Sequence, residues 1–501
     1  MGDQLHVPVG WEQWAERKLA PLNTNAVEHS PEYRRMITAS DCLLFALTYL
    51  PHHLRSAETG GRLSLCPFHV DTAARALQWA RDDLGPDAAP HEAEIAPRGC
   101  GKTSWAFLIR PLWALAHGHK SFVQVITSTG GKAAQHLSTL KRELLTNARL
   151  RQDYPELCTP GRLGGRSDTD TKAQYVAQSG VTIAAGGIGS ALLGAKHGNV
   201  RPDALIVDDI EQDEGHYSAG TKASHLDTLQ QAVFDMNPDA AVLLAGTTTA
   251  YGSLMHELVR SATGGDTADW IAERRVRAYY YPAILRDKAG VESALWPQRW
   301  SIEWLQAQRK FRWFWANYMN MPLSADGGFW VPADLRYGDG RDVAWRGLWL
   351  DPAVTSGPRA DYTGVAVVGR NHRRDAVVEH SQQIRVAPAG MRSVMLGLLG
   401  VPVDPPITDV FVEVVQGGEA IPEVLKPLPP GVKLHSFRPQ GGKPARFGRV
   451  HDLWRRGWVE LVGSHPVLVD QALQFPNGRN DDCLDAVCAG IEHVLKGRPV
   501  T

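Results

Sequence analysis

Short apolar runs alternate with longer amphipathic stretches between residues 92 and 302. The apolar runs are Ala93–Ala96, Phe122–Thr127, Val181–Ala185, Ala204–Val207 and Val242–Ala245. The amphipathic stretches include Gly101–Ala116, Lys132–Asn147 and His216–Phe234. Strands that alternate with helices in this way are typical of a mostly parallel sheet with helices on both faces. The pattern therefore predicts an α/β unit.

A second strand-led pattern follows a segment rich in proline and glycine, Pro322–Gly340. Its predicted strands are Gly347–Asp351, Gly364–Gly369, Asp375–Glu379 and Val410–Val414, and its predicted closing helices are Pro466–Phe475 and Asp481–Leu495. Because proline and glycine interrupt regular structure, we expect a linker between the patterns. The sequence thus predicts a helical segment over 1–90 that belongs to the first unit, an α/β unit over 91–325, a linker over 326–345, and a second α/β unit over 346–501.

The composition is that of an ordinary globular protein, with 43% hydrophobic and 21% charged residues in 501. Lys and Arg number 53 against 54 Asp and Glu, which excludes a protein that coats nucleic acid through bulk positive charge. Six cysteines are scattered without a C-x-x-C pair, a distribution that disfavours a zinc ribbon or a disulfide scaffold. No run of 18 apolar residues occurs, so we expect no membrane association.

The segment Ala96–Thr103 (APRGCGKT) follows an apolar run and opens a helical stretch. A phosphate-binding loop needs this context, because its glycines and the helix N-terminus aim backbone N–H groups at phosphates. Lys102 would reach the β- and γ-phosphates of ATP, and Thr103 would offer a hydroxyl to Mg²⁺. The residues expected to contact the nucleotide are Arg98, Gly99, Cys100, Gly101, Lys102 and Thr103. The alternative is a glycine-rich turn with a chance Gly-Lys-Thr, since Ala96 replaces the usual first glycine.

Acidic residues end a later apolar run, in Ala204–Glu211 (ALIVDDIE). Ligands of open α/β sheets bind at the carboxyl ends of strands. We therefore expect Asp208 to hold Mg²⁺ and either Asp209 or Glu211 to act as general base toward the attacking water. The next run ends in Gly246–Thr249 (GTTT), whose hydroxyls either sense the γ-phosphate or form a turn that caps the following helix.

Carboxylates also mark the second unit, where Asp351 and Glu413 lie at or near strand ends. Asp481, Asp482 and Asp485 lie at the start of the last predicted helix, along one edge of its apolar stripe. Oxygen ligands of this kind suit a two-metal phosphodiesterase site with Mg²⁺ or Mn²⁺. Each of these acids could instead be a helix cap, a turn residue or a solvent-facing side chain.

The segment between residues 433 and 458 carries seven Lys or Arg and one acid, a local net charge of +6. Such a segment either tracks a nucleic-acid backbone or forms a solvated helix face.

Taken together, these motifs resemble the large terminase subunit of tailed bacteriophages, an ATP-driven DNA-packaging motor and nuclease. The similarity covers most of residues 90–495, and its most specific part is Gln471–Ala486 (QALQFPNGRNDDCLDA). The other stretches that carry it are Pro97–Thr103, Asp208–Glu211, Gly246-Thr247, Phe314–Pro322 (FWANYMNMP), Asp351, Glu413 and Lys443–Arg446 (KPAR). The resemblance implies an additional-strand P-loop ATPase domain with a mostly parallel sheet, followed by an RNase H-like α/β nuclease domain.

The same resemblance implies ATP with Mg²⁺ in the ATPase site and two Mg²⁺ or Mn²⁺ in the nuclease site. The catalytic residues that it implies are Arg98, Asp209, Glu211, Asp351, Glu413 and Asp482. Asp209 stands where a glutamate is often found, which leaves the base open between Asp209 and Glu211. Leu192–Lys196 (LLGAK) lacks an arginine often seen there, so no trans-acting arginine finger is assigned.

The partners implied are double-stranded DNA, a small terminase subunit, a portal protein and further copies of the chain in a ring, expected to be a pentamer. The expected location is the host cytoplasm and transiently the procapsid portal, not the mature virion. Two alternatives remain from the sequence. One is an RNase H-like recombinase or transposase with a regulatory ATPase, and the other is a structural assembly scaffold with a degenerate ATP site.

Overall fold

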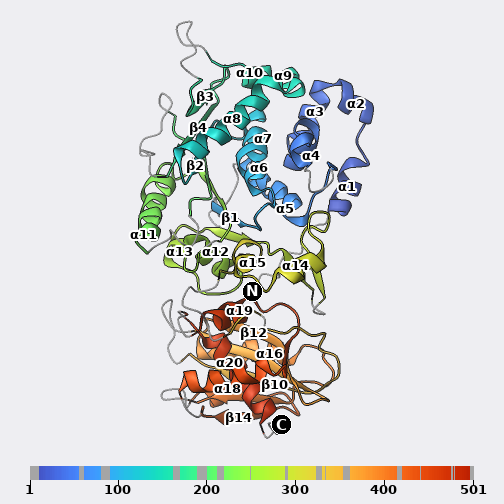
Figure 1. Ribbon diagram of the computed structural model, residues 1–501, viewed down its shortest axis with the longest axis vertical. Helices are drawn as coiled ribbons and strands as arrows, with labels where there is room; N and C mark the ends of the chain where they lie inside the picture. Colours follow the sequence, from blue (N-terminus) through green and yellow to red (C-terminus); the bar gives the residue numbers. More distant parts are fainter. Residues whose placement is uncertain are drawn as a thin grey trace.

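The computed structural model describes residues 11–55, 61–80, 91–161, 170–188, 200–211, 219–248, 250–287, 291–322, 330–332, 334–353, 362–414, 420–439, 442–475, 478 and 480–496. These residues form two units stacked along the long axis of the molecule, one coloured blue to yellow and the other orange to red (Figure 1). Each unit is built around its own β-sheet.

The first unit contains a seven-stranded sheet with the strand order β3-β4-β2-β5-β6-β1-β7. Its strands are β1 His91–Ile95, β2 Phe122–Thr127, β3 Gln174–Val176, β4 Thr182–Gly187, β5 Ala204–Asp208, β6 Ala241–Gly246 and β7 Arg277–Tyr280. Neighbouring strands are parallel except β3 and β4. Strand β6 lies between β1, which leads into the glycine-rich loop, and β5, which ends at Asp208. This inserted strand is the arrangement of the additional-strand P-loop fold that the resemblance implies.

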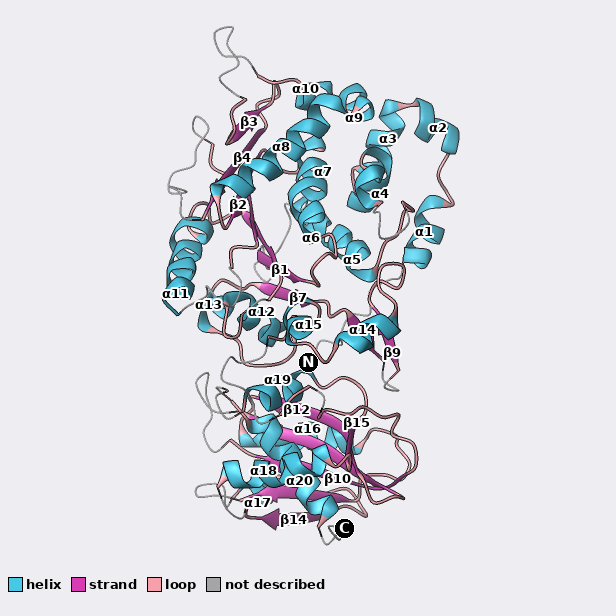
Figure 2. Cartoon of the chain, viewed as in Figure 1, coloured by secondary structure: helices cyan, strands magenta, loops and turns pink. Residues whose placement is uncertain are grey.

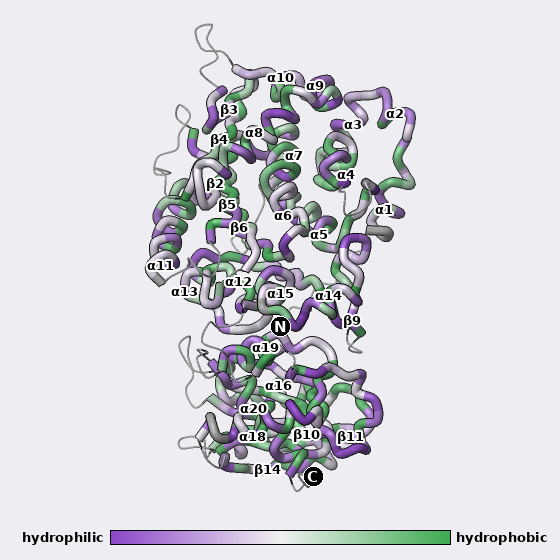
Figure 3. The backbone as a smooth tube through the Cα atoms, in the orientation of Figure 1, coloured by the Kyte–Doolittle hydropathy of each residue, from purple (hydrophilic) through white to green (hydrophobic). Residues whose placement is uncertain are grey.

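Alternate residues of these strands enter two hydrophobic cores on opposite faces of the sheet. In β5, Ile206 packs into one core, whereas Leu205 and Val207 pack into the other. The helices that contribute to the first core include α4 Cys42–Tyr49, α5 Pro67–Ala76, α7 Arg110–Ala116 and α8 Gly130–Thr146. Those that contribute to the second include α12 Leu254–Ala262 and α13 Asp269–Glu273. Figure 2 shows helices on both sides of the strands, and Figure 3 shows the hydrophobic residues concentrated inside.

The other helices of this unit are short. They are α1 Trp11–Leu19, α2 Thr24–His29, α3 Pro31–Thr38, α6 Lys102–Ser104, α9 Ala148–Asp153, α10 Pro155–Cys158, α11 Ala219–Thr228, α14 Ile302–Gln308 and α15 Arg312–Asn317. A small hairpin of β8 Ile284–Arg286 and β9 Glu292–Ala294 completes it. Arg34 on α3 donates two hydrogen bonds of 2.7 Å to Asp153, and the Tyr49 hydroxyl donates a third. This buried ion pair fastens the N-terminal helices to the first unit.

The second unit contains a six-stranded sheet with the order β14-β13-β10-β11-β12-β15. Its strands are β10 Val343–Asp351, β11 Thr363–Asn371, β12 Ala376–Ile384, β13 Asp409–Glu413, β14 Lys433–Phe437 and β15 Val459–Leu461. The first three pair with one another in antiparallel fashion, and β13 and β14 then add in parallel beside β10. This order is that of an RNase H-like sheet. Its helices are α16 Pro388–Leu399, α17 Ile421–Val424, α18 Lys443–Arg455, α19 Pro466–Gln474 and α20 Asp482–Leu495.

Helix α20 is anchored closely on this sheet. A Cβ atom on Gly364 of β11 would collide with the backbone carbonyl of Asp482, so glycine is needed for the approach. The N–H of Leu484 donates to Oε1 of Gln471 on α19 at 2.8 Å. The first turn of α20 is therefore fixed by its contact with the sheet and by its hydrogen bond to α19.

The two units meet along α12 and α19, which face each other in Figure 1. Asp470 on α19 pairs with His256 at 3.1 Å and with Arg260 at 3.4 Å, both on α12. The described part of the segment predicted as a linker, 326–345, contains exposed residues and two points of attachment to the second unit. Trp330 is buried against aromatic rings of the second unit, and the N–H of Gly338 donates to the carbonyl of Leu461 at 2.9 Å.

All six cysteines are buried, and none forms a disulfide. Burial raises the pKa of Cys158 and of Cys483 to about 12. Because the thiolate is the reactive form, these thiols are chemically inert in the folded chain.

Several predicted elements match the structure closely: β2 has the predicted bounds, and α19 and α20 begin within one residue of them. The predicted helix over His216–Phe234 is described from Ala219 and changes to a π-helical turn at Leu229. Helix α18 lies within the basic segment over 433–458, for which a helix face is one of the two alternatives above. The sequence predicts no strands over β14 and β15, both of which the structure contains. Among the described residues, none of the helices has the length and apolar character needed to cross a bilayer.

Candidate active sites

The loop after β1 has the backbone that a phosphate-binding loop requires. Gly99 and Gly101 have φ angles of +79° and +81°, in the left-handed region that favours glycine. A Cβ atom on Gly99 would also lie 3.0 Å from Nη2 of Arg299. The helical turn α6 begins at Lys102, directly after Gly101. Ala96 is accommodated at the start of the loop, where it is fully buried.

Lys102 is buried and folded back over the loop. Its Nζ donates to the carbonyls of Ala96 at 2.7 Å and Pro97 at 2.9 Å, and to Oγ1 of Thr247 at 2.7 Å. Burial lowers the pKa of Lys102. The ammonium group therefore lies between the loop and the end of β6, and Thr247 belongs to this site and not to the cap of the next helix, which is Ser253.

Asp208 and Thr103 form the pair of oxygen ligands expected for Mg²⁺. The Thr103 hydroxyl donates to Oδ2 of Asp208 at 3.0 Å, and Oδ1 of Asp208 is buried with no hydrogen-bond partner among the described residues. Burial and the neighbouring Asp209 raise the pKa of Asp208 to about 7. A cation beside Asp208 would offset both the burial of its charge and the repulsion from Asp209, so the residues present fit Mg²⁺.

The two candidates for the general base differ in their surroundings. Asp209 is exposed directly beyond β5, with a φ angle of +44°. Glu211 accepts hydrogen bonds from the backbone N–H groups of Leu254 at 2.5 Å and Met255 at 3.2 Å. Glu211 thus caps the N-terminus of α12, whereas Asp209 remains beside Asp208 and Lys102. Its charge adds to the burial that raises the pKa of Asp208 and opposes the burial that lowers the pKa of Lys102.

The segment Phe314–Pro322 links the phosphate-binding loop to the end of β6. The N–H of Arg98 donates to the carbonyl of Asn317 at 2.8 Å, and Oδ1 of Asn320 accepts the N–H of Thr248 at 3.0 Å. The side chain of Arg98 is exposed. Thr249 and Leu192–Lys196, which also entered the sequence analysis, lie outside the described residues.

Two further residues support the loop and carry no motif. Nε2 of His69 on α5 lies 2.8 Å from the carbonyl of Cys100, and Nδ1 of His69 accepts the N–H of Cys66. Both ring nitrogens are thus used by backbone groups, which disqualifies the nearby set of Cys66, His69 and Cys100 as a metal site. The guanidinium group of Arg299 lies close to Gly99.

The second unit brings together three carboxylates from three elements. Oxygens of Asp351 at the end of β10, Glu413 at the end of β13 and Asp485 on α20 lie within 4.8 Å of one another. Burial and the charges of Glu413 and Asp485 raise the pKa of Asp351 well above its usual range. Burial and Asp485 raise the pKa of Glu413 to about 6. Oε2 of Glu413 is buried without a hydrogen-bond partner among the described residues, so this acid cluster fits divalent cations.

Asp482, predicted as the catalytic acid of this helix, lies outside the cluster of three. Its carboxylate is near enough to add to the raised pKa of Asp351, but it contributes least among the neighbouring charges. Asp481 lies one residue earlier and pairs with Nζ of Lys443 at 2.6 Å. Of the three aspartates predicted as possible ligands, Asp485 is therefore the one that shares a site with Asp351 and Glu413.

The basic segment over 433–458 is partly neutralised by α20. Arg446 is buried, and its Nη2 donates to both oxygens of Asp485 at 2.6 and 2.9 Å. Lys443 pairs with Asp481 and lies 3.2 Å from Asp485, and Arg449 pairs with Glu492 at 2.7 Å. These three cations pair with acids of α20. Only Arg446 among them is buried; Lys443 and Arg449 are exposed, as are Lys433, Arg438, Arg455 and Arg456.

Comparison with known proteins gives a structural likeness alone. No family model and no curated protein matches the chain. Among solved structures, it is similar to the large terminase of a thermophilic bacteriophage, with 11% identity and a TM-score of 0.29 over 84% of this chain and 98% of that one. It is similar to large terminases. Single domains show the same likeness. The human cytomegalovirus terminase nuclease domain matches with 17% identity and a TM-score of 0.26, over 33% of this chain and 91% of that one. The ATPase domain of the Thermus phage P74-26 large terminase matches with 16% identity and a TM-score of 0.30, over 48% of this chain and 90% of that one.

The terminase-like motifs of the sequence fall into the two clusters described above. Lys102, Thr103 and Asp208 lie at the strand ends of the seven-stranded sheet. Asp351 and Glu413 lie at the strand ends of the six-stranded sheet. The contacts of His69 and Arg299 with the loop and of Arg446 with Asp485 were not predicted from the sequence. Arg446 lies within the KPAR stretch, and its motif could have indicated it; His69 and Arg299 contact the loop only through the fold.

Proposed function

We propose that the chain is a viral DNA-packaging motor. ATP hydrolysis in the first unit would drive translocation of double-stranded DNA into a procapsid, and a metal-dependent endonuclease in the second would cut concatemeric DNA. The observation that carries the proposal is the presence, in one chain, of a Lys102–Thr247 and Thr103–Asp208 phosphate site and of an Asp351–Glu413–Asp485 cluster on an RNase H-like sheet.

In the ATPase site, Lys102 would exchange its loop carbonyls for the β- and γ-phosphates, whose negative charge it is placed to offset. Thr103 and Asp208 would hold Mg²⁺, and Arg98 would reach the nucleotide from the exposed side of the loop. The Mg²⁺ held by Thr103 and Asp208 would supply positive charge that offsets the negative charge of the phosphates during hydrolysis. Asp209 would orient the attacking water and accept its proton, because Glu211 is engaged at α12.

Asp209→Asn is expected to lower ATP turnover by at least about a hundredfold while nucleotide binding persists, because a general base typically contributes that much. Glu211→Ala is the matched comparison. It should lower the melting temperature, since losing a helix cap costs about 1 kcal/mol, and retain most of the turnover. Phosphate release and binding of a fluorescent ATP analogue measure the two effects. The reverse ranking of the two variants would assign the base to Glu211.

In the nuclease site, Asp351, Glu413 and Asp485 would hold two Mg²⁺ or Mn²⁺ ions. Two such ions, when bound, activate a water and stabilise the leaving oxygen of a phosphodiester. Arg446 orients Asp485 through both of its oxygens, and Lys443 lies at the rim, where it could meet a DNA phosphate. Asp482 and Asp481 would assist at the edge of the site.

The partners proposed are double-stranded DNA, a small terminase subunit, a portal protein and further copies of this chain in a ring on the procapsid. Their support is the resemblance of the sequence motifs to large terminases. The direct test is protection of linear double-stranded DNA from DNase after incubation with the cognate procapsid and ATP. Joining of cut ends into target DNA would favour a recombinase instead, and absence of ATP hydrolysis would favour a scaffold.

A further inference from the structure

A cluster of two histidines and one glutamate lies on the first unit, apart from the sites above. His52 and His53 belong to the 3-10 turn Pro51–Leu54 that follows α4, and Glu143 belongs to α8. Nε2 of His52 lies 3.0 Å from Oε1 of Glu143, and Nε2 of His53 lies 2.9 Å from the same oxygen. The three atoms lie within 4.8 Å of one another.

The carboxylate of Glu143 is held in place from behind. Nδ2 of Asn147 donates to Oε2 of Glu143 at 3.0 Å and to the carbonyl of Tyr49 at 2.7 Å. Oδ1 of Asn147 accepts the N–H of Leu150 at the start of α9, which fixes the orientation of the amide. Oε1 is therefore directed at the histidines by a second layer of hydrogen bonds, as is usual for carboxylates that bind metals.

The arrangement brings three atoms that can bind a metal close to one point. The two imidazole rings are sequence neighbours with centroids 4.4 Å apart, and both nitrogens converge on a single oxygen. Two protonated rings at that separation would repel each other. Two neutral imidazoles and a carboxylate are, however, a known ligand set for Zn²⁺. With ligand distances near 2.0–2.1 Å, tetrahedral donors stand about 3.3 Å apart, close to the two distances from the histidine nitrogens to Oε1 of Glu143.

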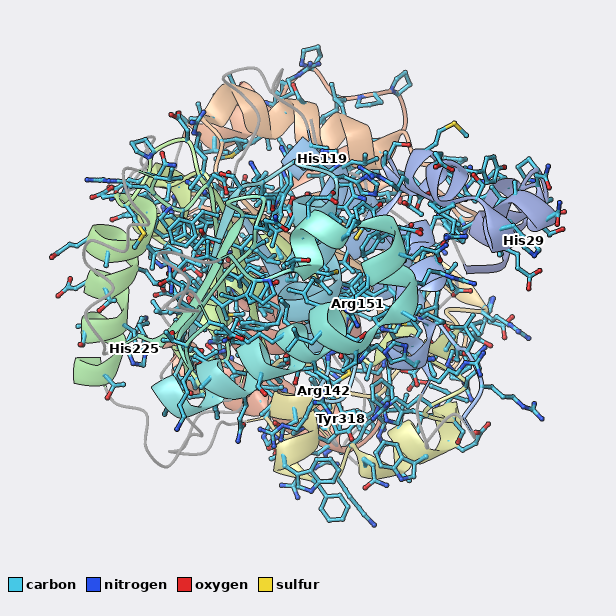
Figure 4. The ribbon with its side chains drawn as sticks, turned by 90° about the horizontal axis from the view of Figure 1, so that it is seen from above. His29, His119, Arg142, Arg151, His225 and Tyr318 are labelled. Atoms are coloured by element: carbon cyan, nitrogen blue, oxygen red, sulfur yellow. The ribbon has the colours of Figure 1, made fainter. Side chains whose placement is uncertain are left out.

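A pocket of about 360 Å³ opens beside these ligands. It is lined by His52 and Glu143, and also by Thr146, Asn147 and Arg149. The pocket leaves room for a further ligand such as water, as in zinc sites that have three protein ligands. Figure 4 looks onto this end of the molecule, where Arg142 marks α8 and Arg151 marks α9.

We propose that His52, His53 and Glu143 form a binding site for a divalent transition metal, with Zn²⁺ as the best match. The site would join the turn after α4 to α8, two elements about ninety residues apart in sequence. Imidazole ligands distinguish it from the all-carboxylate cluster of the second unit, which suits Mg²⁺ and Mn²⁺. The inference does not depend on the ATPase or nuclease activity.

The test is a titration of the full chain with ZnCl₂ after removal of metals by chelation. Millimolar Mg²⁺ is present to occupy the carboxylate sites. The parent chain and the Asp351→Asn variant are each expected to bind one Zn²⁺ that His52→Gln and His53→Gln bind at least about tenfold more weakly. His29→Gln is the matched control, because His29 is exposed and lies at the outer edge of the helical segment (Figure 4).

A second measurement keeps the result independent of folding. Co²⁺ in place of Zn²⁺ should give the visible absorption bands of a low-symmetry site in the parent and in His29→Gln, and not in His53→Gln. Circular dichroism would verify that the variants remain folded. Because 54% of the His52 side chain is exposed, His52→Gln should disturb the core less than His53→Gln. Equal zinc affinity of the parent and both histidine variants, or no binding by the parent, would overturn the proposal.

Discussion

Replacing Lys102 by alanine is expected to reduce ATP hydrolysis by about a hundredfold or more, because one buried cation at the transferring phosphate is typically worth that much. Lys102 is the ammonium group that joins the loop to Thr247, and no other lysine hydrogen-bonds to the loop among the described residues. Release of inorganic phosphate from ATP measures the effect. DNA cutting should persist in this variant, since the acid cluster lies on the other sheet.

The matched control is Lys172→Ala, which removes an exposed lysine of the same unit. This variant should hydrolyse ATP at the parent rate. The loss in Lys102→Ala should appear with no change in circular dichroism, because Lys102 makes its hydrogen bonds to the loop and to Thr247 and not to the cores. Normal turnover in Lys102→Ala would refute the ATPase assignment.

Replacing Asp351 by asparagine is expected to reduce DNA cutting by at least about a thousandfold, since losing a metal forfeits several kcal/mol of transition-state stabilisation. Glu413→Gln should have a comparable effect. EDTA should abolish cutting by the parent, and Mn²⁺ should restore it at least as well as Mg²⁺. Relaxation of supercoiled plasmid measures the activity. Parent-level cutting by both variants would mean that these acids are not the metal ligands.

Asp485 and Asp482 provide an internal comparison within one helical turn. Asp485→Asn should lose cutting as Asp351→Asn does, because Asp485 shares the cluster and is oriented by Arg446. Asp482→Asn should retain much more activity. If Asp482→Asn were the inactive variant and Asp485→Asn the active one, the metal would lie further toward the start of α20 than the carboxylate positions indicate.

The Asp351→Asn variant should also change stability in a way that can be measured without DNA. The folded chain holds the proton of Asp351 more tightly than the unfolded chain does, so ionising this group destabilises the fold and stability falls as pH rises through the raised pKa. Asp351→Asn removes this cost. In EDTA at neutral pH the variant should melt above the parent by a few degrees, and added Mn²⁺ should stabilise the parent more than the variant.

Much of the fold follows from local patterns in the sequence. Strand β2 and the starts of helices α19 and α20 are predictable within a residue, because a buried parallel strand is a short continuous apolar run and an amphipathic helix has a strong 3.6-residue period. Strand β14 (KLHSF) escapes prediction because it is a half-buried edge strand with no apolar run. The π-helical turn over Trp105–Ile109 is also invisible, since its residues have the same apolar pattern as an α-helix.

The candidate sites are predictable to the level of the motif and no further. Sequence spacing places Asp481, Asp482 and Asp485 along one helix edge, but which of them reaches Asp351 depends on how α20 seats on Gly364. Likewise, Glu211 can be separated from Asp209 only once the N-terminus of α12 is located. The pair His52 and His53 gives no signal with Glu143, because the contact spans about ninety residues.

The burial of every native thiol has a practical consequence for watching this molecule at work. Maleimide dyes need a solvent-accessible thiolate, so a cysteine introduced on the surface would be the reactive one without prior removal of the native six. Lys172 and Arg373 are exposed positions in the first and second units. A donor and an acceptor fluorophore on Lys172→Cys and Arg373→Cys would report, by resonance energy transfer, whether the distance between the units changes with each round of nucleotide turnover.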